Sequence, residues 1–268
     1  MARLRLDRLL TERGLAPSRE KARGMILAGE VTVNGQRVDK AGAPISEDAV
    51  LAVNSRQLRY VSRGGLKLEG AIRDFAVDFR DKTVIDVGAS TGGYTDCALQ
   101  NGASRVYAID VGYGQLDWKL RNDERVINME RTNIRAVRPA DIGMLADIIV
   151  MDVSFISTAL IFPVLKNLLK PEGSVIGLIK PQFEAGREQV GKKGVVRDPR
   201  VHAAVLEKCI AAAASEGLGC NGITPSPLRG PEGNIEFFIL LHKDAPVMTE
   251  VNARIGEVVA AAHAAEVK

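Results

Sequence analysis

Short apolar runs recur along the chain after residue 80. The clearest runs are at 83–87, 106–110, 126–129, 146–153, 174–179 and 235–241. Runs of four to eight aliphatic and β-branched residues without polar alternation are typical of strands that are buried on both faces of a sheet. Between them, apolar residues at helical spacing predict helices, for example over 66–75 and 199–214. Strands that alternate with helices predict an α/β fold of the Rossmann type.

The first 60 residues have a different pattern. Apolar residues at helical spacing predict a helix over 4–13 and a second helix that begins at the N-cap Ser18 and ends at Gly29. An Asn-Gly pair inside 31–38 separates two apolar runs, which predicts a tight β-hairpin, and 50–53 predicts one more short strand. We therefore expect a small α+β domain ahead of the α/β domain.

A polar, basic stretch followed by two glycines lies between these two patterns and predicts a linker. We expect a small domain at 1–60, a linker at 61–65 and a larger domain at 66–268. The chain has a net charge of +3, whereas residues 1–60 hold 11 Lys and Arg against 7 Asp and Glu. A basic excess confined to one small domain is typical of nucleic-acid binding.

The basic residues of the two expected helices and the segment before them are the candidate contacts with RNA phosphates. These residues are Arg3, Arg5, Arg19, Lys21 and Arg23. A basic helix face that lies along a phosphate backbone supplies affinity without sequence specificity. The alternative interpretation is a charged helix face that is simply exposed to solvent.

A glycine-rich turn follows the strand expected at 83–87. Glycines let the backbone turn sharply and approach a ligand closely, and the helix that follows leaves its first N–H groups free to bind. About 20 residues later an acid ends the next strand, where a carboxylate can hold two ribose hydroxyls. The candidate ligand-binding residues here and at the following strand ends are Asp86, Gly88, Ser90, Thr91, Gly92, Gly93, Asp110, Asn133 and Asp152.

The order of the glycines distinguishes between classes of cofactor. Dinucleotide-binding turns read G-x-G-x-x-G, whereas this turn reads G-A-S-T-G-G from Gly88. The pattern D-x-G-x-x-x-G-G after a strand resembles the first motif of S-adenosylmethionine-dependent methyltransferases, whose cofactor has no pyrophosphate to bind. Asp110 suits either cofactor. A glycine turn in an α/β domain without a ligand is the alternative interpretation.

Four ionisable residues that are far apart in the sequence are each expected at the edge of a regular element near one crevice. Asp152 and Lys180 end apolar strands, Glu236 begins one, and Lys67 lies near the start of a helix. Lysine is rarely buried without a partner, so Lys180 in this position is a site candidate. Asp152 has a second interpretation, as the N-cap of the helix expected at 157–169.

Lys67, Asp152, Lys180 and Glu236 match, in order and context, the catalytic tetrad of ribose 2′-O-methyltransferases of the FtsJ type. The stretch 18–35 is similar to the signature of the S4 RNA-binding fold, and the whole chain resembles the TlyA family of ribosomal RNA methyltransferases. The strings that carry this resemblance are VSRGGLKL (61–68), DVGASTGGYTD (86–96), MDVSFIS (151–157), IKPQFE (179–184), GVVRDP (194–199) and GNIEFF (233–238). One departure is Tyr60, where relatives usually have tryptophan in the interdomain linker.

The resemblance implies a class I methyltransferase domain with a mixed, mostly parallel seven-stranded sheet, preceded by an S4-like domain. It implies S-adenosylmethionine as methyl donor, no metal, and transfer to the 2′-hydroxyl of a cytidine in large-subunit ribosomal RNA, and in longer members in the small subunit as well. Lys180 would take or balance the hydroxyl proton, while Asp152 and Glu236 would orient the two lysines. The implied partners are ribosomal RNA or subunits, with no membrane, and the chain is expected as a monomer or weak dimer.

Three other functions are weaker interpretations. A nicotinamide-linked oxidoreductase needs a hydride-handling residue, and none of the three histidines ends an expected strand. A membrane-lytic protein needs a longer apolar segment than 153–165. A non-catalytic RNA-binding or ribosome-assembly protein would not need the four ionisable residues. The three cysteines have no metal spacing and suggest a reducing compartment, so we expect a cytoplasmic protein.

Overall fold

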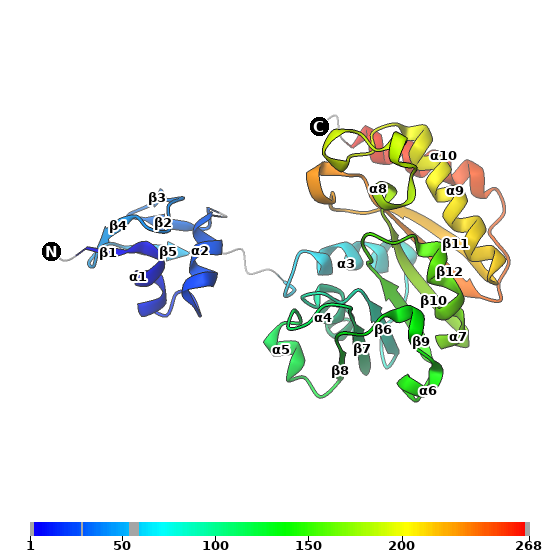
Figure 1. Cartoon of the computed structure of the whole chain (residues 1–268), viewed down its shortest axis with the longest axis horizontal. Helices are drawn as coiled ribbons and strands as arrows, with labels where there is room; N and C mark the ends of the chain where they lie inside the picture. Colours follow the sequence, from blue (N-terminus) through cyan, green and yellow to red (C-terminus); the bar gives the residue numbers. More distant parts are fainter. Residues whose placement is uncertain (1–2, 28, 54–58, 266–268) are drawn as a thin grey trace. The chain divides into compact units, whose positions relative to one another are not determined.

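A computed structural model describes residues 3–27, 29–53 and 59–265 of the chain, and its elements are labelled in Figure 1. These residues form two units, one within 1–58 and the other within 59–268. The smaller unit has one hydrophobic core, and the larger unit has a core on each face of its sheet.

The small unit packs two helices against short antiparallel strands. Its elements are β1 (Arg3–Arg5), α1 (Leu6–Glu12), α2 (Arg19–Leu27), β2 (Val31–Val33), β3 (Gln36–Arg37), β4 (Pro44–Ser46) and β5 (Leu51–Val53). Strand β1 pairs with β4, and β2 lies between β3 and β5. Leu6, Leu10 and Ile26 are fully buried between the helices and strands. The predicted pair of helices and the predicted hairpin are confirmed.

The first helix is shorter than predicted. It begins at Leu6 rather than at residue 4, because Arg3–Arg5 pair with Pro44–Ser46 as an extended strand. The hairpin turn has the left-handed dihedrals that a tight turn requires, with φ of +49° at Asn34 and +79° at Gly35.

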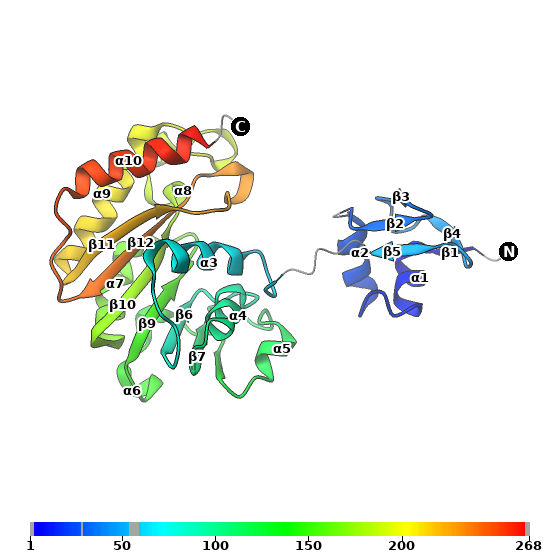
Figure 2. The same ribbon diagram turned by 180° about the vertical axis from the view of Figure 1, so that it is seen from behind.

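The larger unit is a seven-stranded sheet with helices on both faces (Figures 1 and 2). Its strands are β6 (Thr83–Val87), β7 (Arg105–Ile109), β8 (Val126–Met129), β9 (Ala146–Met151), β10 (Leu169–Ile179), β11 (Leu218–Pro225) and β12 (Phe237–Lys243). They lie in the order β11-β12-β10-β9-β6-β7-β8. Strand β12 is antiparallel to both of its neighbours, and the other adjacent pairs are parallel. The predicted mixed, mostly parallel sheet is confirmed.

Helices of very different length precede, connect and follow these strands. They are α3 (Gly64–Phe75), α4 (Gly93–Gln100), α5 (Trp118–Arg121), α6 (Pro139–Ile142), α7 (Phe162–Leu168), α8 (Pro181–Glu184), α9 (Pro199–Ser215) and α10 (Val251–Ala264). Short 3-10 turns lie at Ile134–Ala136, Thr158–Leu160, Arg187–Gln189, Lys192–Gly194 and Pro231–Gly233.

Successive residues of a central strand face opposite layers. On β9, Ile149 packs in a cluster with residues of α7, α9 and α10, whereas Ile148 and Val150 pack in a cluster with residues of α3 and α4. Side chains alternate across a strand, so a strand covered on both faces has mostly apolar positions. This explains why the runs show no regular polar alternation; Asp86 in β6 and Asp147 in β9 are two acids within them.

Strand β11 was not predicted. Its sequence, LGCNGITP, holds two glycines and an asparagine in place of a β-branched run, and its pairing with β12 shifts between Cys220 and Gly222. The helix predicted over 157–169 is also shorter than expected. It begins at Phe162, and Leu169 already starts β10.

Residues 61–65, expected as the linker, lie within the larger unit. Tyr60 is 2% exposed, and the Val61 N–H donates to the Asp96 carboxylate at 2.8 Å. Helix α3 then begins at Gly64. The chain therefore enters the larger unit at Arg59, because burial of Tyr60 and the bond to Asp96 fix this stretch.

We expect Gly65 to tolerate no side chain. A Cβ atom there would lie 2.3 Å from Cγ of Tyr60, so Gly65→Ala should lower the free energy of unfolding by about 1–3 kcal/mol. Gly256→Ala in α10 is the matched control, because nothing lies within 4 Å of its Cβ position. Alanine there should stabilise by about 0.5–1 kcal/mol. Denaturant unfolding measures both, and equal shifts would contradict the prediction.

Candidate active site

Four polar residues lie at the carboxyl ends of neighbouring strands. They are Asp86 in β6, Asp110 after β7, Asp152 after β9 and Lys180 after β10. Strands β7, β6, β9 and β10 are adjacent and parallel, so these ends meet at one edge of the sheet. Ligands of open α/β sheets bind at this edge.

The turn after β6 approaches the neighbouring strand end very closely. Gly88 has a φ of +85°, and a Cβ atom on it would lie 2.4 Å from the Asp152 carbonyl oxygen. The Asp152 N–H donates to the Val87 carbonyl at 2.9 Å. Because a side chain at Gly88 would strain the dihedral and push the two strand ends apart, glycine is required here.

A cavity of about 540 Å³ lies beside this turn. Its lining includes five of the predicted ligand-binding residues, Gly88, Ser90, Asp110, Asn133 and Asp152. The two carboxylate oxygens of Asp110 each accept a backbone hydrogen bond, from the N–H of Ser90 at 2.8 Å and that of Gly112 at 2.7 Å. The orientation of this carboxylate is therefore fixed.

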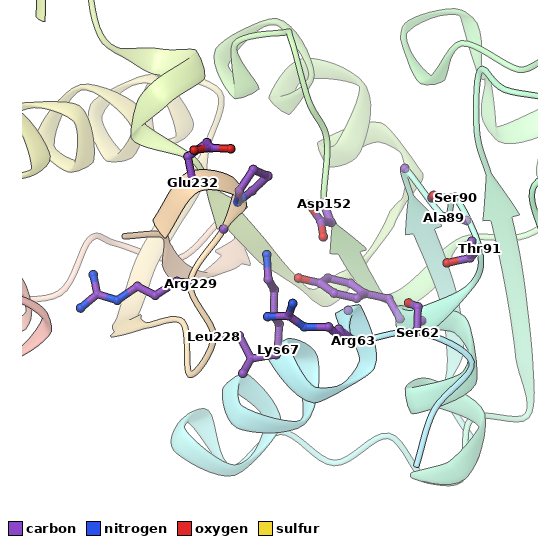
Figure 3. Close-up of a pocket in the computed structure, with 16 residues that line it drawn as sticks. Ser62, Arg63, Lys67, Ala89, Ser90, Thr91, Asp152, Leu228, Arg229 and Glu232 are labelled. Atoms are coloured by element: carbon purple, nitrogen blue, oxygen red, sulfur yellow. The ribbon is translucent and has the colours of Figure 1, made fainter. Parts of the chain in front are cut away.

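A second cavity, of about 500 Å³, shares Gly88, Ser90 and Asp152 with the first. Thr91 and Gly93 of the predicted set also line it. Figure 3 shows Lys67 rising from α3 toward the space in front of Asp152, with the segment 228–232 before β12 forming another wall. Asp152 thus lies where the two cavities meet.

Asp86 and Gly92 are not among the residues that line either cavity. Asp86 is fully buried, and its carboxylate accepts a hydrogen bond from the Thr95 hydroxyl at 2.6 Å. Gly92, with a φ of +94°, lies against Leu120 rather than against a cavity. Both residues lie beneath the turn that forms the cavity walls.

The four candidate catalytic residues form two lysine–carboxylate pairs. Lys67 Nζ lies 2.5 Å from Oε2 of Glu236, and Lys180 Nζ lies 2.6 Å from Oδ1 of Asp152. The Glu236 side chain is 0% exposed, and the other three are between 11% and 21% exposed. The Gln182 side-chain amide donates to the second oxygen of Glu236 at 3.2 Å. The segment that carries Lys180 therefore also contacts the other pair.

An aromatic pair, Phe155 and Phe183, lies next to the Asp152–Lys180 pair and was not predicted. Phe155 is 88% exposed and has a φ of +63°, which is unusual for a bulky residue. Its ring centroid lies 4.7 Å from that of Phe183. The neighbouring Ser154 hydroxyl accepts a hydrogen bond from Lys180 at 2.9 Å. The signal in the sequence was one phenylalanine shortly after the end of β9 and another shortly after the end of β10.

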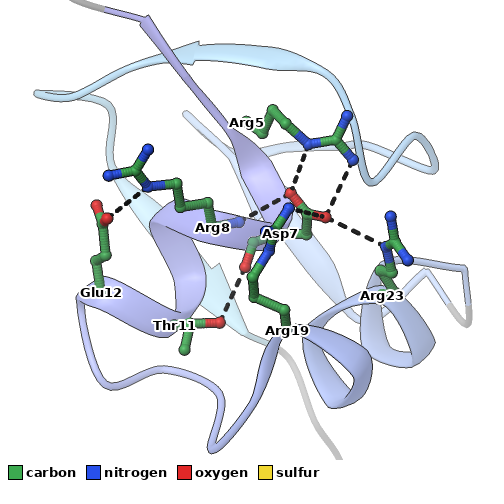
Figure 4. A network of polar contacts seen from close by, with 7 residues as sticks. All are labelled: Arg5, Asp7, Arg8, Thr11, Glu12, Arg19 and Arg23. Carbon is green, nitrogen blue, oxygen red and sulfur yellow. Dashed lines mark hydrogen bonds and ion pairs between the residues drawn. The ribbon is translucent and has the colours of Figure 1, made fainter.

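The candidate RNA contacts lie in the small unit. Arg5, Arg19 and Arg23 all contact the carboxylate of Asp7 (Figure 4). Asp7 was not singled out in the sequence, because an acid among arginines resembles an ordinary solvated charge. The two remaining candidates are exposed residues, Arg3 in β1 and Lys21 in α2.

Comparison with known proteins agrees with both units. Residues 60–243 match the family model described as FtsJ-like methyltransferase, and residues 4–51 match that of the S4 domain. YqxC of Bacillus subtilis, provisionally named as an rRNA methyltransferase, is 59% identical over 240 residues, which cover 89% of this chain and 85% of YqxC. TlyA of Mycobacterium tuberculosis, a 16S/23S rRNA (cytidine-2′-O)-methyltransferase, is 44% identical over 240 residues, covering 89% and 90%.

A solved structure of a provisionally named hemolysin from Streptococcus thermophilus is also similar. It has a TM-score of 0.78 and 47% sequence identity, and the match covers 98% of this chain and 97% of that one. This chain belongs to the TlyA family.

Membership of the TlyA family makes the chain an S-adenosylmethionine-dependent methyltransferase. The glycine turn and the fixed Asp110 carboxylate provide a suitable cradle, because Gly88, Ser90 and Asp110 together line the first cavity. In the part of the chain that is described, no helix has the length and apolar character needed to cross a membrane.

The Asp86 carboxyl should make stability depend on pH. Burial, reinforced by the charge of Asp152, raises the pKa of Asp86 to about 7 from 3.8, although the hydrogen bond from Thr95 lowers it. Between these two pKa values the folded protein holds a proton that the unfolded chain releases. Stability therefore falls as pH rises through this window, by about 1.4 kcal/mol per pH unit, and levels off above pH 7.

Asp86→Asn cannot ionise, so the stability difference between wild type and variant should change with this slope between about pH 5 and 7. Denaturant unfolding at several pH values in this window measures it. A loss of stability caused by the substitution that does not depend on pH leaves this slope unchanged. Parallel stability curves for the two proteins would show that Asp86 does not titrate there.

Proposed function

We propose that this TlyA-family enzyme transfers a methyl group to the ribose 2′-hydroxyl of a cytidine in ribosomal RNA. The Mycobacterium tuberculosis relative, named for this reaction, is 44% identical to the chain. The observation that carries the proposal is the Asp152–Lys180 pair, which places an oriented lysine amine beside one of the residues shared by both cavities.

The first cavity is the proposed site of S-adenosylmethionine. Asp110 would hold the ribose hydroxyls, Asn133 would contact the adenine, and Gly88 and Ser90 of the turn would surround the remainder, which would extend toward Thr91 and Gly93 of the second cavity. Asp86 and Gly92 would support this turn from below. When bound, S-adenosylmethionine supplies an electrophilic methyl group on a sulfonium. No step of this chemistry calls for a metal.

The reaction forms a bond between the 2′-oxygen and the methyl carbon, breaks the carbon–sulfur bond and releases the hydroxyl proton. Lys180 is the proposed catalytic residue that takes this proton or balances the charge of the oxygen that loses it. Asp152 at 2.6 Å and the Ser154 hydroxyl at 2.9 Å orient the Lys180 amine for either role. A hydroxyl held in line with the methyl group lowers the barrier further.

Lys67 and Glu236 are proposed to hold the RNA side of the site. Lys67 lines the second cavity, and its pairing with the buried Glu236 keeps its amine in place there. The Gln182 amide links Glu236 to the segment that carries Lys180. A shift of Lys67 would therefore be felt at Lys180 through Glu236 and Gln182.

The aromatic pair of Phe155 and Phe183 is proposed to receive the target base. A ribose 2′-oxygen reaches a recessed site only if its nucleotide leaves the stack, and an extruded base needs a surface on which to stack. Phe155 offers such a surface next to Lys180, with Phe183 fixing its ring at a centroid distance of 4.7 Å.

The small unit is proposed to bind the ribosomal RNA backbone through Arg3, Arg5, Arg19, Lys21 and Arg23. Guanidinium and ammonium groups supply sequence-independent affinity for phosphates. The partner is then a ribosomal subunit or its RNA, and the groups proposed for catalysis all lie in one chain, so a monomer suffices.

Transfer of labelled methyl groups from S-adenosylmethionine to separated, unmodified ribosomal subunits and naked ribosomal RNA tests the proposal. We expect label on the 2′-oxygen of a cytidine, and the labelled particle identifies the substrate. Label on a base or on protein, or none at all despite binding of S-adenosylmethionine, would refute the proposed acceptor.

Lys180→Ala should lower the rate of transfer by about 10²–10⁴-fold, the usual contribution of a group that handles a proton. The thermal shift caused by S-adenosylmethionine should remain. Lys170→Ala is the matched control, because Lys170 lies at the other end of β10 and pairs with Asp147 at 2.8 Å, away from both cavities. Comparable activity of the two variants would remove Lys180 from the mechanism.

Phe155→Ala should lower kcat/KM for RNA by about 5- to 150-fold, because base–aromatic stacking contributes about 1–3 kcal/mol. Phe155 also lines the first cavity, so the thermal shift caused by S-adenosylmethionine is measured in parallel; a shift that falls as much as kcat/KM would assign Phe155 to the cofactor rather than to the base. Trp118→Ala provides the control, since Trp118 is 77% exposed in the same unit but lines neither cavity. An equal effect of the two variants would argue against base stacking at Phe155.

A further inference from the structure

One buried carboxylate in the small unit holds three arginines (Figure 4). Asp7 is 0% exposed and is contacted by Arg5 through two nitrogens at 3.1 Å, by Arg23 at 3.2 Å and by Arg19 at 3.3 Å. The backbone N–H of Arg8 donates to the same carboxylate at 2.9 Å. Both oxygens of Asp7 are therefore fully engaged.

The three guanidinium groups remain available to a ligand. The side chains of Arg5, Arg19 and Arg23 are 48%, 54% and 57% exposed, although each contacts Asp7. A guanidinium has five N–H donors, so contacts with one carboxylate leave donors free on each group. Three cations around one anion also leave a local charge of about +2, which suits a polyanion.

The arginines come from separate elements that the carboxylate ties together. Arg5 ends β1, Asp7 lies in the first turn of α1, and Arg19 and Arg23 lie four residues apart on α2. Without the anion, three neighbouring cations would repel one another and their long side chains would sample many rotamers. Arg5, together with Arg19, holds the pKa of the Asp7 carboxyl well below its usual range, so the anion persists at neutral pH.

We propose that Asp7 is a positioning residue that holds the guanidinium groups of Arg5, Arg19 and Arg23 in one arrangement for binding adjacent phosphates of RNA. This rests on the proposed RNA-binding function of the small unit. Asp7 does not contact RNA in this proposal. It restricts the three arginine side chains before RNA binds, so that less side-chain conformational entropy is lost on binding.

The sign of one substitution separates this role from simple electrostatics. Asp7→Asn removes a negative charge from a basic surface, so charge alone predicts tighter binding to RNA. The positioning role predicts weaker binding, because a neutral amide no longer collects the guanidinium groups. The two views therefore make opposite predictions for the same variant.

The test measures the dissociation constant of the full-length protein for unmodified ribosomal RNA at several salt concentrations. We expect Asp7→Asn to raise the dissociation constant at least tenfold. The slope of the logarithm of the binding constant against the logarithm of the salt concentration should become shallower by about one for each phosphate contact that is lost. In turnover, KM for RNA should rise while kcat at saturating RNA stays unchanged. A structural defect of the whole protein would lower kcat instead.

Glu12→Gln is the matched control. It makes the same charge change on the same helix. Glu12 is exposed, and it pairs with Arg8 at 2.6 Å rather than with the three arginines around Asp7. We expect its affinity for RNA to stay unchanged or to rise. If Asp7→Asn binds as tightly as wild type or more tightly, the positioning role is refuted while the RNA-binding function stands. If wild type itself does not bind ribosomal RNA, both proposals fail.

A second measurement decides the matter if Asp7→Asn fails to fold. Arg19→Ala and Arg23→Ala change exposed side chains, and each leaves Asp7 with two arginine partners. Because both arginines are held through one carboxylate, their effects on the dissociation constant should be coupled, and the double variant should deviate at least threefold from the product of the single effects. Independent, multiplicative effects would overturn the proposal.

Discussion

The close approach of Gly88 to the backbone of Asp152 sets the geometry of the whole site. The Gly88 N–H donates to the Ile109 carbonyl at 2.9 Å, and the Asp152 N–H donates to Val87 at 2.9 Å. Three strand ends are thereby joined through a turn that has no room for a side chain. Parallel strands bring Asp110 and Asp152 to one edge of the sheet, and this contact sets the spacing of their strand ends, so binding and chemistry depend on the same glycine.

The two lysine–carboxylate pairs are better explained by function than by stability. A buried ion pair recovers little more than the cost of removing its charges from water, so it is weak evidence of a stabilising role. Glu236 is fully buried with Lys67, whereas Lys170 and Asp147 at the opposite end of the sheet form a pair whose lysine is 47% exposed. Of these two pairs at opposite ends of the sheet, the more deeply buried one therefore lies on the side where the strand ends open to the cavities.

Much of this arrangement follows from the sequence, because strand ends and glycine turns have local signals. The central strands, the turn at Gly88 and the placement of Asp152 and Lys180 at strand ends could all be predicted. Which carboxylate pairs with which lysine could not, since it depends on β12 inserting antiparallel between β10 and β11. Phe155 was also missed. Its position depends on a left-handed backbone dihedral, which the spacing of apolar residues along the chain does not reveal.

Asp7 and Asp86 show how the surroundings of a carboxylate determine what it can do. Both side chains are fully buried. Asp7 pairs with three arginines, of which Arg5 and Arg19 lower its pKa. Burial, reinforced by the charge of Asp152, raises the pKa of Asp86, because the one hydroxyl that donates to it offsets this only in part. An ionised acid can gather cations, as Asp7 does at the surface. An acid that is readily neutralised can support the glycine turn without adding a second permanent charge beneath Asp152.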